Sequence, residues 1–332
     1  MAMFRYEDGA LPHGLAMLWI AGGYGGGIAL LGQPSLAANA AGVVLLASAF
    51  VIAAYFIHEC SHNTVFRDAG WNVRLGHVLS WIVGACYTPL VSIVEKHMVH
   101  HTDRIDNVSY DYRPLLRRRP WLASLFRALE FCYVPAVELW MHLVALTAPW
   151  HVAERREDRG RVLAVLAVRG ACFALLWVWS PRAVLGYALA YVLFVHVLRF
   201  MDCFQHTYAL RVVNARADLA ELARQSRDYE QDNTFSNPLS VTVPPVNWLT
   251  LNFSFHNAHH LKPSEPWYRL PAIHREMYGS LAAHTLSFAQ LLANYHRFRT
   301  ARVLDDYGDE GQGLGDVAQF AGALGVSFLT QY

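Results

Sequence analysis

The chain has 332 residues, of which 54% are apolar and 16% charged, and its formal net charge is +1. Soluble proteins carry about 25% charged residues, so this composition excludes intrinsic disorder and is too apolar for an ordinary soluble enzyme. The near-zero charge argues against a nucleic-acid partner, because phosphate binding needs an excess of Lys and Arg. Histidine is abundant, with 17 residues, and imidazole is the commonest metal ligand in proteins.

Four apolar stretches reach the roughly 20 residues that a helix needs to cross a bilayer. They cover residues 13–33, 36–57, 162–180 and 183–200. Two further apolar stretches, 75–94 and 129–150, are interrupted by polar residues. We predict that these two are interfacial or re-entrant. The pattern therefore predicts an all-α integral membrane protein with four transmembrane helices.

Positive charge is distributed unevenly along this arrangement. With four crossings, residues 1–12, 58–161 and 201–332 share one side and, together with Arg199 at the end of the last span, contain 25 of the 27 Lys and Arg residues. Such an excess marks the cytosolic side. We predict a single membrane-bound domain over residues 1–332, in the inner membrane of a bacterium. Its cytosolic helical cap comprises residues 58–161 and 201–300, and a flexible tail begins near residue 301.

Three short motifs contain eight of the histidines. HECSH places two of them four residues apart, whereas HMVHH and HNAHH each place three at positions i, i+3 and i+4. Residues three and four apart share one face of a helix, so each motif can direct its imidazoles at one point. The eight are His58, His62, His97, His100, His101, His256, His259 and His260.

HECSH also matches the zinc-protease signature H-E-x-x-H, in which the Glu is the general base. An intramembrane zinc protease is therefore an alternative. The number of ligands argues against it, because a catalytic zinc takes three protein ligands, whereas eight imidazoles supply two metals. Nitrogen donors without thiolates favour iron over magnesium or calcium. We predict a dimetal site that activates O2 and is held by the helical cap.

In this order the three motifs resemble the histidine boxes of the membrane-bound fatty acid desaturase and hydroxylase superfamily. HECSHNTVFR is similar to the first box, and NFSFHNAHHLKPSEPWYRLP resembles the third box with its flanking Asn and Pro. The resemblance covers residues 36–275. It implies a non-haem diiron site, with a further His between the last span and the third box and a polar residue four positions before it.

The matching positions are His206 and Asp202 in MDCFQHTY. Asp202 replaces the Asn of the family pattern; it ligates iron, holds His206 in place, or is a solvated residue at a helix end. Glu59 is expected to orient an imidazole from outside the metal ligands. The resemblance thus implies two irons held by nine histidines, with electrons from an external ferredoxin-like or cytochrome donor.

The resemblance implies an O2-dependent oxidase of a long-chain fatty acyl substrate, and we favour a fatty acid desaturase. Oxidative decarboxylation of free fatty acids to terminal alkenes is the first alternative, and hydroxylation or ketolation of a lipid or carotenoid is another. A membrane haem protein would need histidines deep inside the spans, where only His196 qualifies.

Overall fold

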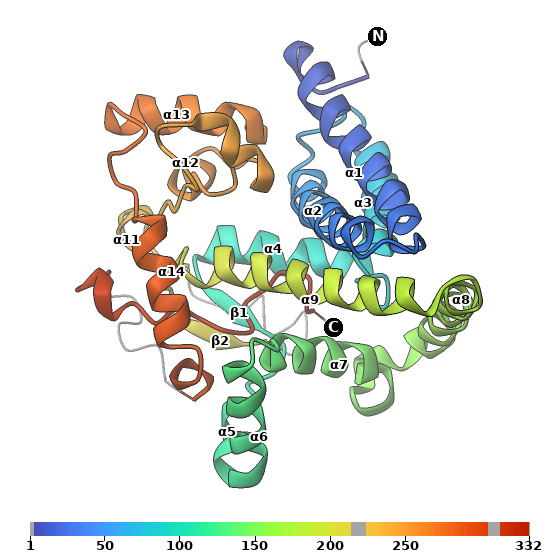
Figure 1. Ribbon diagram of the computed structural model, residues 1–332. Helices are drawn as coiled ribbons and strands as arrows, with labels where there is room; N and C mark the ends of the chain where they lie inside the picture. Colours follow the sequence, from blue (N-terminus) through green and yellow to red (C-terminus); the bar gives the residue numbers. More distant parts are fainter. Residues whose placement is uncertain (1–2, 214–223, 305–312, 332) are drawn as a thin grey trace. The chain divides into compact units, whose positions relative to one another are not determined.

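A computed structural model describes residues 3–213, 224–304 and 313–331, and it is mostly helical (Figure 1). The chain divides into two compact units. Unit 1 comprises Met1–Leu90 and Leu146–Val197, and unit 2 comprises Val91–Ala145 and Leu198–Tyr332. Residues 214–223 of the predicted cap and 305–312 of the predicted tail lie outside the described residues.

Unit 1 is built mainly from long apolar helices. They are α1 (Ala10–Leu31), α2 (Leu36–Ser61), α3 (Ala69–Ile82), α8 (Arg159–Trp179) and most of α9 (Pro181–Cys203). Four segments of the described chain are long and apolar enough to cross a membrane, namely Glu7–Leu31, Leu36–Ser61, Ala153–Trp179 and Pro181–Cys203. The predicted number of spans is therefore confirmed.

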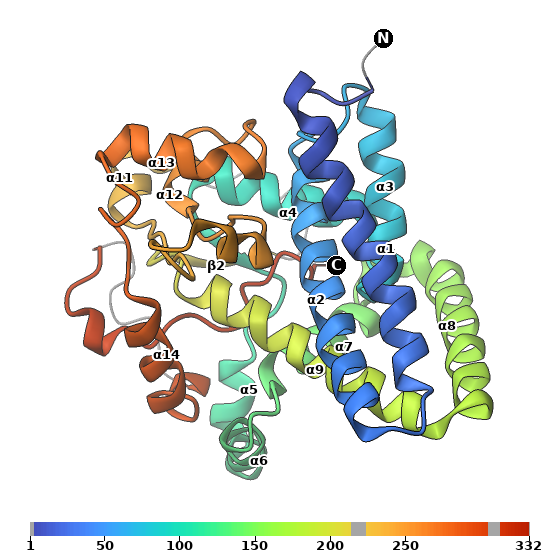
Figure 2. The ribbon, with the colours of Figure 1, turned by 45° about the horizontal axis from the view of Figure 1, so that its top comes forward.

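Close approach of α1 and α2 depends on glycine. A Cβ atom added at Gly27 would lie 2.9 Å from Cβ of Leu46, and one added at Gly42 would lie 2.9 Å from the carbonyl oxygen of Gly27. Any side chain at these positions would push the two backbones apart, as at other helix contacts in membranes. Both views show the two helices side by side (Figures 1 and 2).

The stretch 75–94 is broken, in agreement with its polar interruptions. Helix α3 ends at Ile82, and α4 (Leu90–Asp103) begins eight residues later. Two arginines of α8 bind the carbonyl groups around this break: Arg169 Nη1 donates to Trp81 O at 2.9 Å, and Arg161 Nη1 donates to Cys86 O at 2.8 Å. Helix ends leave such carbonyls without intrahelical partners, so the arginines compensate for the break.

Unit 2 contains shorter elements. After most of α4 come β1 (Asp106–Val108), α5 (Arg113–Arg118), α6 (Pro120–Phe131), α7 (Ala136–His151), β2 (Leu210–Val212), α11 (Arg227–Asp232), α12 (His256–Leu261), α13 (Leu270–Tyr278) and α14 (Phe288–Arg297). Helices α6 and α7 are bent by 119° at their junction, which interrupts the stretch 129–150 as expected. Strands β1 and β2 pair in parallel, with Asp106 opposite Leu210. Each strand is only three residues long and the described residues contain almost no other sheet, so the predicted all-α architecture is confirmed.

A buried ionic network lies in unit 2. Arg199 Nη1 is 2.8 Å from Glu130 Oε2 and 2.9 Å from Glu138 Oε2, and Arg199 Nε donates to the Tyr295 hydroxyl at 2.7 Å. Buried charges persist only when they are paired and hydrogen-bonded. The network therefore ties α6, α7, α9 and α14 together, beside an apolar core that includes Phe126, Val137, Val303 and Leu324.

The end of the chain differs from the predicted flexible tail. Asn294 Nδ2 donates to Val317 O at 2.7 Å and to Phe320 O at 3.0 Å. Most residues from Ala323 to Gln331 are buried. Two glycines here adopt left-handed backbone conformations, with φ of +81° at Gly322 and +79° at Gly325. These conformations favour glycine.

Candidate metal centre

Three remote segments of unit 2 carry its candidate metal ligands. Helix α4 carries HMVHH, helix α12 is formed by HNAHHL, and His206 lies three residues after the end of α9. The helical spacing places the histidines of each motif on one face. His206 is held by an isolated β-bridge to Thr234. Tertiary contacts therefore bring together residues that lie up to 160 positions apart in the sequence.

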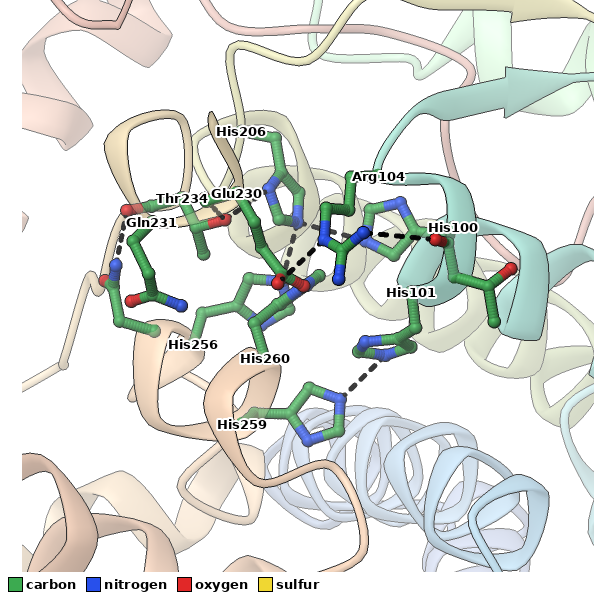
Figure 3. Close-up of polar contacts among 12 residues, drawn as sticks. His100, His101, Arg104, His206, Glu230, Gln231, Thr234, His256, His259 and His260 are labelled. Atoms are coloured by element: carbon green, nitrogen blue, oxygen red, sulfur yellow. Dashed lines mark hydrogen bonds and ion pairs between the residues drawn. The ribbon is translucent and has the colours of Figure 1, made fainter. Parts of the chain in front are cut away.

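One set of four imidazoles, which we call the four-His set, comprises His100, His206, His256 and His260. Nε2 of His206 lies 3.1 Å from Nε2 of His100 and 2.8 Å from Nε2 of His256. Nε2 of His256 lies 3.2 Å from Nε2 of His260. Each residue offers a ligand atom within 4.8 Å of the others. Figure 3 shows these side chains directed toward one another.

In this set, the hydrogen bonds made by the Nδ1 atoms determine whether the Nε2 atoms carry a hydrogen or a lone pair. Nδ1 of His100 is 2.9 Å from the carbonyl oxygen of Ile105, and Nδ1 of His260 is 3.0 Å from Oε1 of Glu230. Carbonyl and carboxylate oxygens only accept hydrogen bonds, so both Nδ1 atoms carry the hydrogen. Their Nε2 atoms consequently present lone pairs to the centre of the set.

His206 is oriented in the same way. Thr234 Oγ1 donates its hydrogen to Glu230 O at 2.6 Å, so it accepts at 3.3 Å from Nδ1 of His206. The Nε2 atoms of His100 and His206 thus bring two lone pairs to 3.1 Å of each other. A cation between them removes this repulsion, and nitrogens about 2.1 Å from one metal lie about 3 Å apart when adjacent. The residues therefore fit a metal ion.

Burial keeps three imidazoles of the four-His set neutral. The pKa values of His206, His256 and His260 lie well below the usual value of 6.5, chiefly because burial disfavours the charged form and also because neighbouring imidazoles repel a proton. Metal ions bind only the neutral imidazole. These three imidazoles are therefore ready to bind a cation at neutral pH.

A second set, which we call the three-His set, comprises His97, His101 and His259. Nε2 of His101 lies 3.1 Å from Nε2 of His97 and 3.0 Å from Nε2 of His259. The rings of His101 and His260 are 4.3 Å apart between centroids, so the two sets are adjacent. This arrangement offers donors for a second metal ion.

The first histidine motif belongs to unit 1. Helix α2 continues past the predicted end of the span to Ser61, and the rings of His58 and His62 lie 4.8 Å apart. Glu59 Oε2 accepts from Thr64 Oγ1 at 2.6 Å, and Glu59 Oε1 is 3.7 Å from Nδ1 of His58. The ligand role of this histidine pair, and the orienting role of Glu59, stay predictions from the sequence.

Glu230 connects His260 of the four-His set to the guanidinium group of Arg104. While Oε1 contacts His260, Oε2 accepts from Nε of Arg104 at 3.0 Å. Partners that orient metal ligands in this way also raise the basicity of the imidazole. The sequence pattern did not identify Glu230, Arg104 or Thr234, because no fixed spacing connects them to the histidine motifs.

A small pocket of about 50 Å³ adjoins the two sets. Histidines of both sets line it, together with ionisable side chains of Lys96, Asp106 and Asp202 and apolar side chains of Phe253, Val326 and Phe328. Among the described residues, Asp202 is not part of either group of converging ligand atoms. Its predicted role beside His206 stays a prediction, although both residues line the same pocket.

Comparison with known proteins gives one family and several relatives. The family model described as fatty acid desaturase matches residues 34–291. The sphingolipid delta(4)-desaturase of Drosophila melanogaster is 25% identical over 245 residues, which cover 72% of this chain and 66% of that protein. The ceramide hydroxylase of Caulobacter vibrioides is 26% identical over 332 residues, which cover 89% of this chain and 84% of that protein.

A third relative is the fatty acid desaturase of Bacillus subtilis. It is 21% identical over 248 residues, which cover 70% of this chain and 66% of that protein. The chain therefore matches slightly less than two thirds of the length of two relatives and most of the length of the third. The matched residues 34–291 include all three histidine motifs and His206.

Proposed function

Because the chain belongs to the fatty acid desaturase family, we propose that it is an O2-dependent oxidoreductase acting on the acyl chain of a lipid. The four candidate spans support an integral membrane protein. The distribution of Lys and Arg supports a cytosolic position for the metal centre, by the positive-inside rule. A substrate drawn from the membrane is consistent with both features.

The observation that carries this proposal is the convergence of seven imidazoles in two adjacent sets within unit 2. Imidazole donors without thiolates suit iron. We propose one iron on the four-His set and a second on the three-His set, with His58 and His62 as further ligands predicted from HECSH. When bound, iron supplies the activation of O2 and the oxidation of an unactivated C–H bond.

The chain's own residues contribute orientation and charge. Ile105 O and Thr234 Oγ1 hold the hydrogens of His100 and His206 on Nδ1, so that Nε2 stays available to a metal. Glu230 does the same for His260 and offsets part of the positive charge of a bound cation. The buried surroundings exclude water from the oxidising centre.

The reaction balances with an external reductant. Desaturation removes two hydrogens from adjacent carbons while O2 takes up those hydrogens, two further electrons and two protons to form two waters. We propose that a ferredoxin-like or cytochrome donor supplies the electrons. Hydroxylation is a second candidate, because the relative named a ceramide hydroxylase aligns with 89% of this chain.

Expression in a host that supplies a reductase tests this proposal. Mass spectrometry of lipids, free acids and headspace hydrocarbons would distinguish an alkene in the chain, an alcohol and a terminal alkene formed with loss of CO2. Metal analysis of the purified protein should give about two irons per chain. A zinc-loaded protein with peptidase activity would overturn the proposal. The control is His77→Ala, which changes an exposed histidine and should leave iron content and product formation unchanged.

A further inference from the structure

The last described residues of the chain are packed into unit 2. Ala323 N donates to Cys203 O at 2.9 Å, and Gly325 N donates to Glu138 Oε1 at 3.4 Å. A Cβ atom at Gly322 would lie 2.8 Å from Cys203 O, so only glycine permits this approach. We call residues 322–331 the C-terminal segment.

Lys96 binds the second half of the C-terminal segment. Its Nζ atom donates to Ser327 O at 2.7 Å and to Thr330 O at 3.4 Å, and the residue is only 3% exposed. The Ser109 hydroxyl also contacts the Gln331 side chain. Burying a polar group such as the lysine amino group is costly unless its hydrogen bonds are made. The lysine and the C-terminal segment therefore stabilise each other's position.

This attachment brings two apolar side chains to the metal centre. Val326 and Phe328 line the pocket that adjoins both histidine sets. The Phe328 ring lies 5.8 Å from the ring of His97, between centroids, and the residue is 8% exposed. Because most of the other lining side chains are polar or charged, these two and Phe253 form the pocket's apolar surface.

We propose that the C-terminal segment forms a wall of the substrate pocket, with Phe328 determining how far an acyl chain advances past the metal centre and Lys96 acting as the positioning residue. This inference rests on the proposed function for its substrate. An acyl chain lies along the apolar side of the pocket. Because the Phe328 ring limits how far the chain advances, its size determines which carbon faces the metals. The polar side chains of the pocket do not determine which carbon is oxidised.

Lysine labelling tests the attachment without any requirement for activity. The chain contains two lysines, Lys96 and the exposed Lys262. An amine-specific acetylating reagent applied to the folded protein in detergent should label Lys262 and leave Lys96 unmodified, as read by peptide mass spectrometry. Deletion of residues 322–332 should make Lys96 reactive. Equal labelling of both lysines in the full chain would overturn the proposal.

Product analysis tests the role of Phe328. Phe328→Ala should change the ratio of products oxidised at different carbons, or of substrate chain lengths accepted, by about tenfold, the scale of a methylene-sized change in an apolar pocket. Iron content should stay at the wild-type value. Phe320→Ala is the matched control, because Phe320 packs on Phe204 and Phe235 and is not part of the pocket lining.

The outcomes separate this inference from the proposed function. An unchanged product pattern in an iron-loaded Phe328→Ala variant would refute the role of Phe328. If Phe328→Ala loses iron, Phe328→Leu retains apolar packing and should show a smaller shift in the same direction; no shift would again refute the proposal. A wild-type protein that oxidises no lipid would refute the proposed function, and labelling of Lys96 would still decide whether the segment is attached.

Discussion

Unit 1 and unit 2 accommodate buried polar groups in different ways. In unit 1, long helices satisfy their own backbones, and the break after α3 is compensated by arginines that donate to carbonyls. In unit 2, charged side chains pair with one another, as in Arg199 with Glu130 and Glu138 and in Arg104 with Glu230. Side-chain pairing leaves an uncompensated buried charge when one member is lost. Substitutions in unit 2 should therefore cost more than those at helix ends of unit 1.

The largest effect is expected at the four-His set. His256→Ala removes the imidazole whose Nε2 contacts both His206 and His260. We expect activity to fall to about one hundredth or less, together with loss of iron, because metal binding depends on the full ligand set. Iron analysis and lipid mass spectrometry measure this. The control is His77→Ala, which changes an exposed histidine of unit 1. A His256→Ala protein that still holds iron and is active would contradict the assignment of His256 as a metal ligand.

The ionic network of unit 2 should give the next largest effect. Arg199→Met leaves the carboxylates of Glu130 and Glu138 buried without their cation. We expect a loss of about 3–5 kcal/mol in the free energy of unfolding, measured by denaturant or thermal unfolding in detergent. Arg199→Lys keeps the charge and should lose less. An unchanged unfolding transition in Arg199→Met would show that the network does not stabilise unit 2.

Glu230 should have an intermediate effect. Glu230→Gln removes the negative charge opposite Nδ1 of His260 and Nε of Arg104. We expect iron affinity to weaken by about 10-fold to 100-fold, as for other residues that orient metal ligands. Competition with a chelator measures this affinity. Glu276→Gln changes an exposed carboxylate and should leave the affinity unchanged; equal affinities in the two variants would remove Glu230 from the metal centre.

The smallest effect is expected in unit 1. Asp68 begins α3 by accepting a hydrogen bond from Trp71 N at 3.1 Å. Asp68→Ala should lower the free energy of unfolding by about 1 kcal/mol, and Asp68→Asn by less, because Asn also caps helices well. Thermal unfolding of both variants provides the measurement. If Asp68→Ala destabilised the protein as much as Arg199→Met, the contrast between the two units would fail.

Much of unit 1 was predictable because its signals are local. Hydropathy located all four candidate spans, with ends within a few residues except for the starts of the first and third, where the short 3-10 helices Glu7–Gly9 and Ala153–Asp158 extend the spans. The polar interruptions of 75–94 correspond to the break after α3, and those of 129–150, in unit 2, correspond to the bend of 119° between α6 and α7. A Cβ atom added at Gly23 or Gly27 would meet atoms of α2, whereas one added at Gly22 or Gly25 would have no neighbour within 4 Å. Composition alone did not distinguish these two pairs.

By itself the sequence determined the helical membrane architecture, the family and the histidines that belong to the motifs, because periodicity and spacing are properties of one segment at a time. Only the tertiary structure sorted six of those imidazoles, together with His206, into two sets, and only it brought Glu230, Thr234 and the C-terminal segment beside them. Their positions depend on hydrogen bonds between residues remote in the sequence, such as Lys96 with Ser327. No local pattern encodes such contacts, since their geometry exists only once the chain has folded.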